Sequence, residues 1–190
     1  VVVAGAESPE KRLWLGDEAE LIAHHVPGVV IARGADRVAG AQKAIREYGC
    51  DVLILDDGFQ YVRLQRDENI LVIDATNPFG NGCLVPRGIL REPPQAMTRA
   101  TQILLTRCDQ AHNLNDLLAD LGRIGPGIPI RKTRHAPQTL WRVSDGTSLP
   151  LDVLRGTEVT AACAIGNPEA FFKTLERLGT IVKRRLAFRD

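Results

Sequence analysis

Short, uninterrupted runs of apolar residues recur along the chain up to residue 105, separated by polar or helical segments. The runs are rich in Val, Ile and Leu and cover residues 29–32, 52–55, 70–73 and 103–105. Continuous apolar runs without alternation are typical of strands that are covered on both faces, as in a parallel sheet. The pattern therefore predicts four buried strands of a mostly parallel sheet.

Helical patterns lie between some of these runs, at residues 18–25 and 38–48. In the second segment the apolar residues repeat at i, i+3 and i+4, and they are Val38, Ala41, Ala44, Ile45 and Tyr48. Such a stripe marks one buried helix face. Alternating strands and helices predict an α/β fold with helices on both faces of the sheet.

The second half of the chain changes character at residues 122–137, which are rich in glycine, proline and basic residues and indicate a turn-rich boundary. Residues 139–143 and 148–153 flank Asp145-Gly146, as in a β-hairpin. A strand at 159–165 and a helix at 169–178 then predict the start of a smaller α/β domain. We therefore predict a core domain at 1–136, a two-stranded linker at 137–155 and a second domain at 156–190.

The composition is that of an ordinary globular protein. The chain has 190 residues, of which 44% are hydrophobic and 25% charged, and this excludes a disordered tail or a collagen-like rod. A net charge of +1 argues against binding to nucleic acid through bulk charge. The cysteines lack zinc-ligand spacing and are expected to be reduced thiols; they are Cys50, Cys83, Cys108 and Cys163. No apolar run is long enough to span a bilayer, and no signal peptide is recognisable.

Two adjacent carboxylates, Asp56 and Asp57, follow the predicted strand at 52–55 and precede Gly58. Ligands of open α/β sheets bind at the carboxyl ends of the strands, and an acid at that place holds Mg²⁺ beside nucleotide phosphates in phosphate-transferring folds. The alternative is a strand-end turn with two solvated acids. The continuation Phe59-Gln60 favours the functional interpretation.

Two further segments carry candidate chemistry. Asp17 precedes a helical pattern, and taken alone the sequence favours a role for it as the N-cap. The loop at residues 77–93 is too long for a plain connector. In it Arg87 and Arg91 are candidates to bind phosphate, or are ordinary exposed arginines on a structured loop.

The segment Thr106-Arg107-Cys108-Asp109 has the outline of the base-reading segment of nucleotide-binding P-loop proteins. By itself this is a weak pattern. No G-x-x-x-x-G-K-[ST] phosphate loop occurs in the sequence. A complete nucleotide site therefore cannot be built from these 190 residues alone.

Together the segments resemble the lipid A 4'-kinase family, the tetraacyldisaccharide 4'-kinases. The matching segments occur in the family's order over nearly the whole chain; they are 16–18, Asp36-Arg37, Asp56-Asp57-Gly58-Phe59-Gln60, Arg63-Leu64, Arg66-Asp67, Phe79-Gly80-Asn81-Gly82, Leu90-Arg91-Glu92-Pro93 and Ile165-Gly166-Asn167-Pro168 with Phe171-Phe172. The Asp-Asp-Gly-Phe-Gln segment, followed at these spacings by Asn-Gly and Arg-Glu-Pro, is specific evidence for this family. Each of these elements alone is weak evidence.

The resemblance implies a P-loop-NTPase-like fold and an ATP- and Mg²⁺-dependent kinase of the 4'-hydroxyl of the acylated glucosamine disaccharide that becomes lipid A. Carried over by position, Asp17 is the general base, and Asp56 and Asp57 serve Mg²⁺ and the phosphates. The resemblance places five further residues in the substrate and phosphate site; they are Arg37, Gln60, Asn81, Arg91 and Glu92. A carboxylate suits the role of proton acceptor, and phosphoryl transfer otherwise needs positioning and charge neutralisation.

The chain departs from the family in several places. The family's phosphate loop is expected upstream of Val1, and a His that supports the base is expected just after Asp190, so we expect an internal fragment that is inactive by itself. Tyr61 stands where the family commonly has His, which puts in doubt any role that requires an imidazole. Arg87 stands where the family usually reads Ala in Pro-Ala-Gly-Pro.

The resemblance also implies a location on the cytoplasmic face of the bacterial inner membrane, with the lipid substrate and the membrane surface as partners and neither nucleic acid nor a protein partner. The basic residues 183–185 are candidates to meet anionic headgroups, although a solvated strand end is the favoured interpretation. Two other functions stay open. One is another P-loop enzyme such as a GTPase, and the other is a non-catalytic nucleotide- or glycolipid-binding module.

Overall fold

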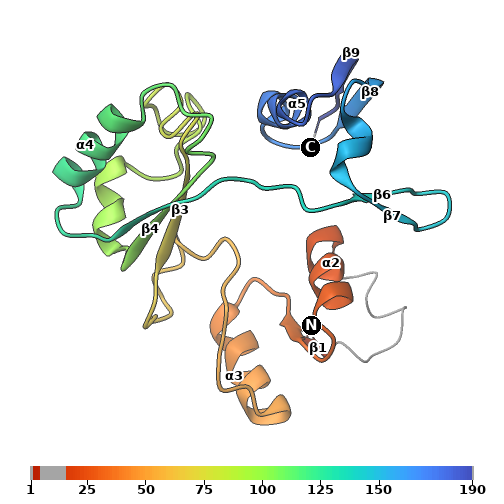
Figure 1. The fold of residues 1–190 in the computed structure, drawn as a ribbon. Coiled ribbons are helices and arrows are strands. Elements are labelled where there is room, and N and C mark those ends of the chain that lie inside the picture. Colours follow the sequence, from red (N-terminus) through yellow and green to blue (C-terminus); the bar gives the residue numbers. More distant parts are fainter. Residues whose placement is uncertain (1, 5–15, 190) are drawn as a thin grey trace. The chain divides into compact units, whose positions relative to one another are not determined.

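The computed structural model describes residues 2–4 and 16–189. The chain divides into two compact units, Val1–Asp67 and Glu68–Asp190, which are described separately (Figure 1). The predicted domain boundary at residues 136–137 lies inside the second unit and stays a prediction.

The first unit contains two short strands and two helices. Strand β1 (Val2–Ala4) pairs with β2 (Val30–Ala32) in antiparallel orientation, and α2 (Asp17–His25) lies between them in the chain. Helix α3 (Arg37–Tyr48) packs beside both strands. It begins where the Asp36 carboxylate accepts hydrogen bonds from the amides of Val38 and Ala39, each at 3.1 Å. The helices predicted at 18–25 and 38–48 are thus confirmed. A strand is also present at 30–32, but it pairs antiparallel with β1 and has no buried residue, so its place among the buried strands of the parallel sheet was predicted wrongly.

The strand predicted at residues 52–55 is wrong, because residues 49–69 form turns and irregular backbone. Val52 is 71% exposed and Ile54 is 92% exposed, so neither side chain gains the burial that a core strand provides. An apolar run alone cannot show whether another strand lies beside it to pair with.

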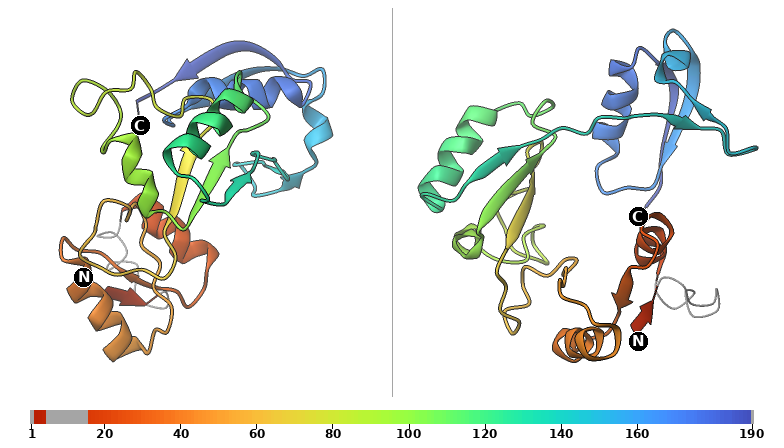
Figure 2. Two further views of the ribbon diagram at one scale, coloured as in Figure 1. Left: turned by 90° about the vertical axis from the view of Figure 1, so that its left-hand side faces the viewer. Right: turned by 60° about the horizontal axis from the view of Figure 1, so that its bottom comes forward.

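The second unit is built on a parallel sheet of β3 (Ile70–Asp74), β4 (Gln102–Thr106) and β5 (Ile130–Lys132), in the order β3-β4-β5. The strands predicted at 70–73 and 103–105 are confirmed. Helix α4 (Leu114–Ile124) lies against the sheet in Figures 1 and 2, and a 3-10 helix, Pro94–Arg99, precedes β4.

More buried and more exposed side chains alternate along β3 and β4, so the core lies on one face of this sheet. Ile73, Ile103 and Leu105 are buried against Leu117 and Leu121 of α4. Ala75 and, from the 3-10 helix, Met97 belong to the same cluster. On the opposite face of β3, Ile70 and Val72 are about half exposed.

A hairpin follows β5, as predicted around Asp145-Gly146, although its strands are shorter than predicted. Strands β6 (Leu140–Trp141) and β7 (Ser148–Leu149) pair in antiparallel orientation. Asp145 Oδ1 accepts a hydrogen bond from the Thr147 amide at 2.9 Å, and Gly146 has φ 69°. The turn therefore uses its Asp and Gly as the sequence indicated.

The last part of the chain forms a β-α-β arrangement of β8 (Glu158–Cys163), α5 (Pro168–Arg177) and β9 (Ile181–Ala187). Strands β8 and β9 are parallel, and α5 lies beside them (Figure 2). Phe172 of α5 is 2% exposed and forms the centre of this packing. The strand predicted at 159–165 and the helix predicted at 169–178 are confirmed with small shifts of their ends.

Candidate functional site

The paired acids Asp56 and Asp57 lie in a tight turn of the first unit, and both residues are exposed. Asp57 has φ 47°, a left-handed conformation that Asp and Asn tolerate better than most residues. Gly58 is buried, and a Cβ added there would lie 2.6 Å from the Leu55 Cβ. The Asp-Asp-Gly order therefore has a steric reason, since only glycine fits the third position.

Two arginines hold the backbone of this acidic loop, residues 56–61. Arg37 Nη1, from the first turn of α3, donates to the carbonyl oxygens of Asp56 at 3.0 Å and Asp57 at 3.2 Å. Arg66 Nη1 donates to the Gly58 carbonyl at 2.6 Å. These charge-assisted hydrogen bonds fix the loop through its backbone.

Tyr61, which stands where the family commonly has His, lies under this arrangement. Its ring centroid is 5.6 Å from the guanidinium carbon of Arg37, which is within cation–π range. Its buried hydroxyl has no hydrogen-bond partner among the described residues. The aromatic ring thus supports Arg37, and through Arg37 it supports the acidic loop.

Asp17 is the first residue of α2, and Gly16 is the N-cap. The interpretation of Asp17 as N-cap is therefore wrong by one position, because the helix begins one residue earlier than that interpretation requires. The first helical turn is a favourable place for a carboxylate. The side chain of Asp17 lies outside the described residues. Gln60, the remaining candidate in this unit, is exposed.

Asn81 organises the long loop at residues 77–93 in the second unit. Its Nδ2 donates to the Arg87 carbonyl at 2.9 Å, and its Oδ1 accepts from the Cys83 amide at 3.1 Å. A Cβ at Gly88 would lie 2.1 Å from the Cys83 carbonyl oxygen and 2.2 Å from Asn81 Oδ1. Asn81, predicted as a substrate residue, thus makes structural hydrogen bonds with both ends of its amide.

The Arg91-Glu92 pair follows this loop. Arg91 is exposed, and Glu92 is partly buried and forms an ion pair with Arg99 of the 3-10 helix. This ion pair fixes the orientation of the Glu92 carboxylate at the end of the loop. The structure thus brings Arg37 together with the two acids in the first unit, and Asn81 together with the Arg87 backbone in the second.

A cluster at the carboxyl ends of β3 and β4 was missed by the sequence analysis. Asp74 Oδ2 accepts from Arg107 Nη1 at 2.5 Å and from Asn167 Nδ2 at 2.9 Å. Asp74 Oδ1 accepts from the amide and the hydroxyl of Thr76, at 3.0 and 2.7 Å. Asn167 also caps α5 by accepting from the Ala170 amide. Asp74 also stands at the end of an apolar run, as Asp56 does, and this was the signal in the sequence that could have identified it.

The electrostatics of this cluster favour the ionised carboxylate. Burial by itself raises the pKa of Asp74, but the hydrogen bonds from Asn167 and Thr76 and the charge of Arg107 outweigh it and hold the pKa below its ordinary value. The Asp74 side chain is 25% exposed and that of Arg107 is 18% exposed. The charged pair lies at the ends of β3 and β4, and the hydrogen bond from Asn167 to Asp74 joins it to the start of α5.

We expect Asp74→Asn to lower the free energy of unfolding by about 2 kcal/mol at pH 7, because Arg107 would lose its carboxylate in a mostly buried site. A depressed pKa stabilises the fold above the pKa of the unfolded state, about 4, and this stabilisation is lost as the pH falls through the lower folded value. Denaturant unfolding should therefore show a difference between variant and parent that shrinks below about pH 4. Asp116→Asn, at an exposed position of α4, is the control, and an equal loss in both variants would contradict the prediction.

Two more residues after β4 contact α5. Asp109 forms an ion pair with Arg177 and also accepts from Arg177 Nη2 through its carbonyl at 2.8 Å. The buried Gln110 donates from Nε2 to the Ala170 carbonyl at 3.3 Å. Asp109, the acid of the base-reading pattern, is therefore already engaged by an arginine of the same unit.

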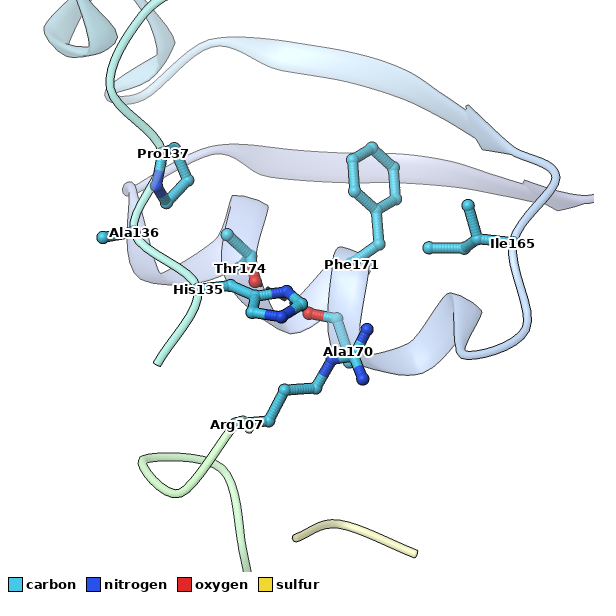
Figure 3. A pocket seen from close by; sticks show the side chains of 8 residues that line it. All are labelled: Arg107, His135, Ala136, Pro137, Ile165, Ala170, Phe171 and Thr174. Atoms are coloured by element: carbon cyan, nitrogen blue, oxygen red, sulfur yellow. Dashed lines mark hydrogen bonds between the residues drawn. The ribbon is translucent and has the colours of Figure 1, made fainter. Parts of the chain in front are cut away.

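A pocket of about 440 Å³ lies beside these contacts (Figure 3). One cation, one imidazole and mostly apolar side chains surround it; its lining is Arg107, His135, Ala136, Pro137, Ile165, Ala170, Phe171 and Thr174. Its cation, Arg107, is the ion-pair partner of Asp74. Residues 135–137 come from the turn-rich segment after β5, and no sequence pattern predicts their contact with α5.

The described residues contain no cluster of three or more His, Cys, Asp and Glu side chains that could hold a metal ion by themselves. A pair of carboxylates is nevertheless a common arrangement for Mg²⁺, which keeps several waters and binds substrate phosphates. Within the ranges 2–4 and 16–189 no helix is both long and apolar enough to cross a membrane.

Comparisons with known proteins agree with the family resemblance of the sequence motifs. The family model of tetraacyldisaccharide-1-P 4'-kinase matches residues 1–190. The tetraacyldisaccharide 4'-kinase of Anaeromyxobacter dehalogenans strain 2CP-C is 42% identical over 98% of this chain and 49% of its own length. That of Syntrophus aciditrophicus is 40% identical over 100% of this chain and 53% of its own length. The chain thus spans about half the length of the curated relatives it matches.

A solved structure has the same fold. The crystal structure of the apo form of LpxK from Aquifex aeolicus in complex with ATP aligns with a TM-score of 0.67 and 32% identity. The alignment covers 100% of this chain and 57% of that chain. The resemblance of the sequence motifs and the predicted α/β class are confirmed. The chain belongs to the tetraacyldisaccharide 4'-kinase family.

Proposed function

We propose that the protein carrying this chain transfers the γ-phosphate of ATP to the 4'-hydroxyl of the tetraacylated glucosamine disaccharide 1-phosphate, a step of lipid A biosynthesis. Family membership over the whole chain supports the reaction class. The observation that carries the proposal is the acidic loop, in which Arg37 and Arg66 hold the backbone while Asp56 and Asp57 stay exposed. Such a fixed pair of carboxylates is what phosphoryl transfer needs beside the phosphates.

The donor set of the acidic loop fits Mg²⁺. Carboxylate oxygens are hard ligands, and the carbonyl oxygens of Asp56, Asp57 and Gly58 accept hydrogen bonds from the two arginines. We assign Asp56 and Asp57 as the residues that would hold the ion. When bound, Mg²⁺ neutralises charge on the β- and γ-phosphates.

Arg37 acts in this proposal as a positioning residue. Its guanidinium is hydrogen-bonded to two carbonyl oxygens of the acidic loop and stacked on Tyr61, so its contribution is to orient Asp56 and Asp57. Asn81 has the same kind of role in the loop that precedes Arg91 and Glu92. We assign Gln60, Arg91 and Glu92 to contacts with the substrate and its phosphates, because polar side chains at fixed loop ends suit such contacts.

Asp17 is the proposed general base. The 4'-hydroxyl has to lose its proton as the oxygen attacks the γ-phosphorus, and a carboxylate in hydrogen-bond reach can accept it. Asp17 is the first residue of α2, so its backbone belongs to a helix rather than to a loop. A base on a rigid element can be held in a productive geometry.

The proposed location and partners follow from the substrate. We propose the cytoplasmic face of the bacterial inner membrane as the site of action, with the disaccharide lipid and the membrane surface as partners and without nucleic acid or a protein partner. We further propose that residues 1–136 belong to the kinase core, 137–155 to a linker and 156–190 to a second domain. The hairpin between β6 and β7 supports the linker.

The two alternative functions gain less support. In a GTPase the acid of the segment 106–109 reads the purine base, but Asp109 is paired with Arg177. A non-catalytic binding module has no use for the exposed acid pair on a loop fixed by two arginines.

The test is a transfer assay with γ-labelled ATP, Mg²⁺ and the disaccharide 1-phosphate, performed with the protein that carries this chain. We expect one labelled product, phosphorylated at the 4'-position. A 4'-deoxy disaccharide should give no product, and GTP in place of ATP should give much less. Binding of both ligands without transfer would establish the non-catalytic module, and release of phosphate from GTP alone would favour a GTPase.

A further inference from the structure

The second unit contains a loop that combines exposed apolar side chains with an exposed arginine. Leu84, Val85 and Ile89 are 43%, 58% and 59% exposed, although they occur within six residues. Arg87 lies between them and is also exposed. We refer to residues 84–89 as the apolar loop. Exposed apolar groups in such density require an explanation, whereas scattered ones do not.

The apolar loop is held in one conformation from inside. The Val85 amide donates to the Leu90 carbonyl at 2.8 Å, and the Gly88 amide donates to the Leu84 carbonyl at 2.9 Å. The Asn81 amide and the close approach of Gly88 to Cys83 brace its base. A loop that is already ordered loses little conformational entropy when it binds.

Charge distinguishes this loop from the other exposed apolar segments. No Asp or Glu occurs between Asp74 and Glu92, so the loop and its surroundings in sequence are purely cationic. By contrast, the exposed residues 52–54 are followed by Asp56 and Asp57, and the exposed apolar residues of α2 follow Glu18 and Glu20.

The basic strand end at residues 183–185 is a weaker candidate for a lipid surface than the sequence indicated. Lys183 pairs with Glu158 at 2.9 Å, and Arg185 pairs with Glu169 at 3.2 Å and also with Glu176. The Arg185 guanidinium also lies over the Phe172 ring, at 5.3 Å from its centroid. These two cations are therefore neutralised by neighbours on the same unit.

We propose that the apolar loop enters the surface of an anionic bilayer, with Val85 and Ile89 at the level of the upper acyl chains and Arg87 among the headgroups. Apolar side chains gain free energy on leaving water, and a flanking arginine meets anionic headgroups while its aliphatic stem stays in the apolar layer. The inference rests on the proposed function, since a kinase of a membrane lipid has to reach a bilayer. It adds that the apolar loop is the surface that contacts the bilayer. This loop lies just before Arg91 and Glu92 in the sequence.

A depth measurement tests this placement. We expect Val85→Trp to show quenching by acyl-brominated lipids in anionic vesicles, above the quenching that the parent shows from its own two tryptophans. The matched control is Val143→Trp, because Val143 is 99% exposed on the β6–β7 hairpin and should show no added quenching. Equal quenching of the two variants would overturn the proposal. Equal quenching of Val85→Trp in zwitterionic vesicles would overturn the role of an anionic surface.

A binding measurement gives an independent check. The double variant Val85→Asp/Ile89→Asp should bind anionic vesicles about tenfold more weakly, and Arg87→Glu about fivefold more weakly. The double serine variant of the same positions guards against misfolding, and thermal unfolding verifies the fold of each protein. Unchanged binding of all three folded variants would contradict the proposal.

The vesicles in these experiments contain neither the disaccharide nor ATP. Failure of the loop to enter them would leave the kinase assay with detergent-dispersed substrate unaffected, and it would overturn this inference alone. Conversely, absence of phosphoryl transfer with intact lipid quenching would overturn the proposed function and leave the contact with the membrane in place.

Discussion

Asp57→Asn and Asp56→Asn should each lower kcat about 100-fold or more, because each removes a full negative charge from the proposed Mg²⁺ and phosphate site. The free energy of unfolding should change by less than about 1 kcal/mol, since both residues are exposed. Asn is the informative replacement because it tolerates the left-handed conformation of Asp57, at φ 47°. The carbonyl oxygens that bind Arg37 also remain unchanged.

The measurements are kcat, KM for ATP and the Mg²⁺ concentration that gives half-maximal activity. Asp51→Asn is the matched control, since Asp51 is an exposed acid five residues before Asp56. We expect both loop variants to need more Mg²⁺ and the control to behave as the parent does. Full activity of both loop variants at the parent's Mg²⁺ concentration would remove these residues from the metal site.

The sequence predicted those elements whose signal is local. Helix α3 and the Asp145-Gly146 turn each depend on a few neighbouring residues, and both were found where expected. Of the stripe predicted on α3, however, only Ala44 is buried, and Ile45 is 50% exposed. The apolar run at 52–55 is rich in Val, Ile and Leu, as β3 is, but forms no strand, because strand formation depends on a partner that the run itself does not specify. Burial therefore separates β3 from residues 52–55, and composition does not.

In the candidate site, too, the sequence identified some of the residues but not the contacts that they make. The sequence singled out Arg37 and Asn81 through a resemblance, but their hydrogen bonds to the backbone at positions 56, 57 and 87 appear only in the structure. The contact between Asp74 and Asn167 joins residues 93 positions apart in the chain. No spacing rule relates such residues, since the folding of β3 and α5 brings them together.

Asp17→Asn should lower kcat about 100-fold to 10,000-fold, because an amide cannot accept the proton of the 4'-hydroxyl. The cost in stability should be small. Asp17 is the first residue of α2 rather than its N-cap, so its replacement removes no capping residue and weakens only the interaction of a charge with the helix dipole, by about 0.5 kcal/mol.

Glu18→Gln is the matched control, because it removes an exposed carboxylate from the same turn of α2 and should keep kcat within about twofold. The KM for ATP should stay near that of the parent in Asp17→Asn, since a base acts in the transition state rather than in binding. Retention of full kcat by Asp17→Asn, together with a lower thermal midpoint for Asp17→Ala, would show that the Asp17 side chain serves the start of α2. The proton acceptor would then have to be sought among other residues.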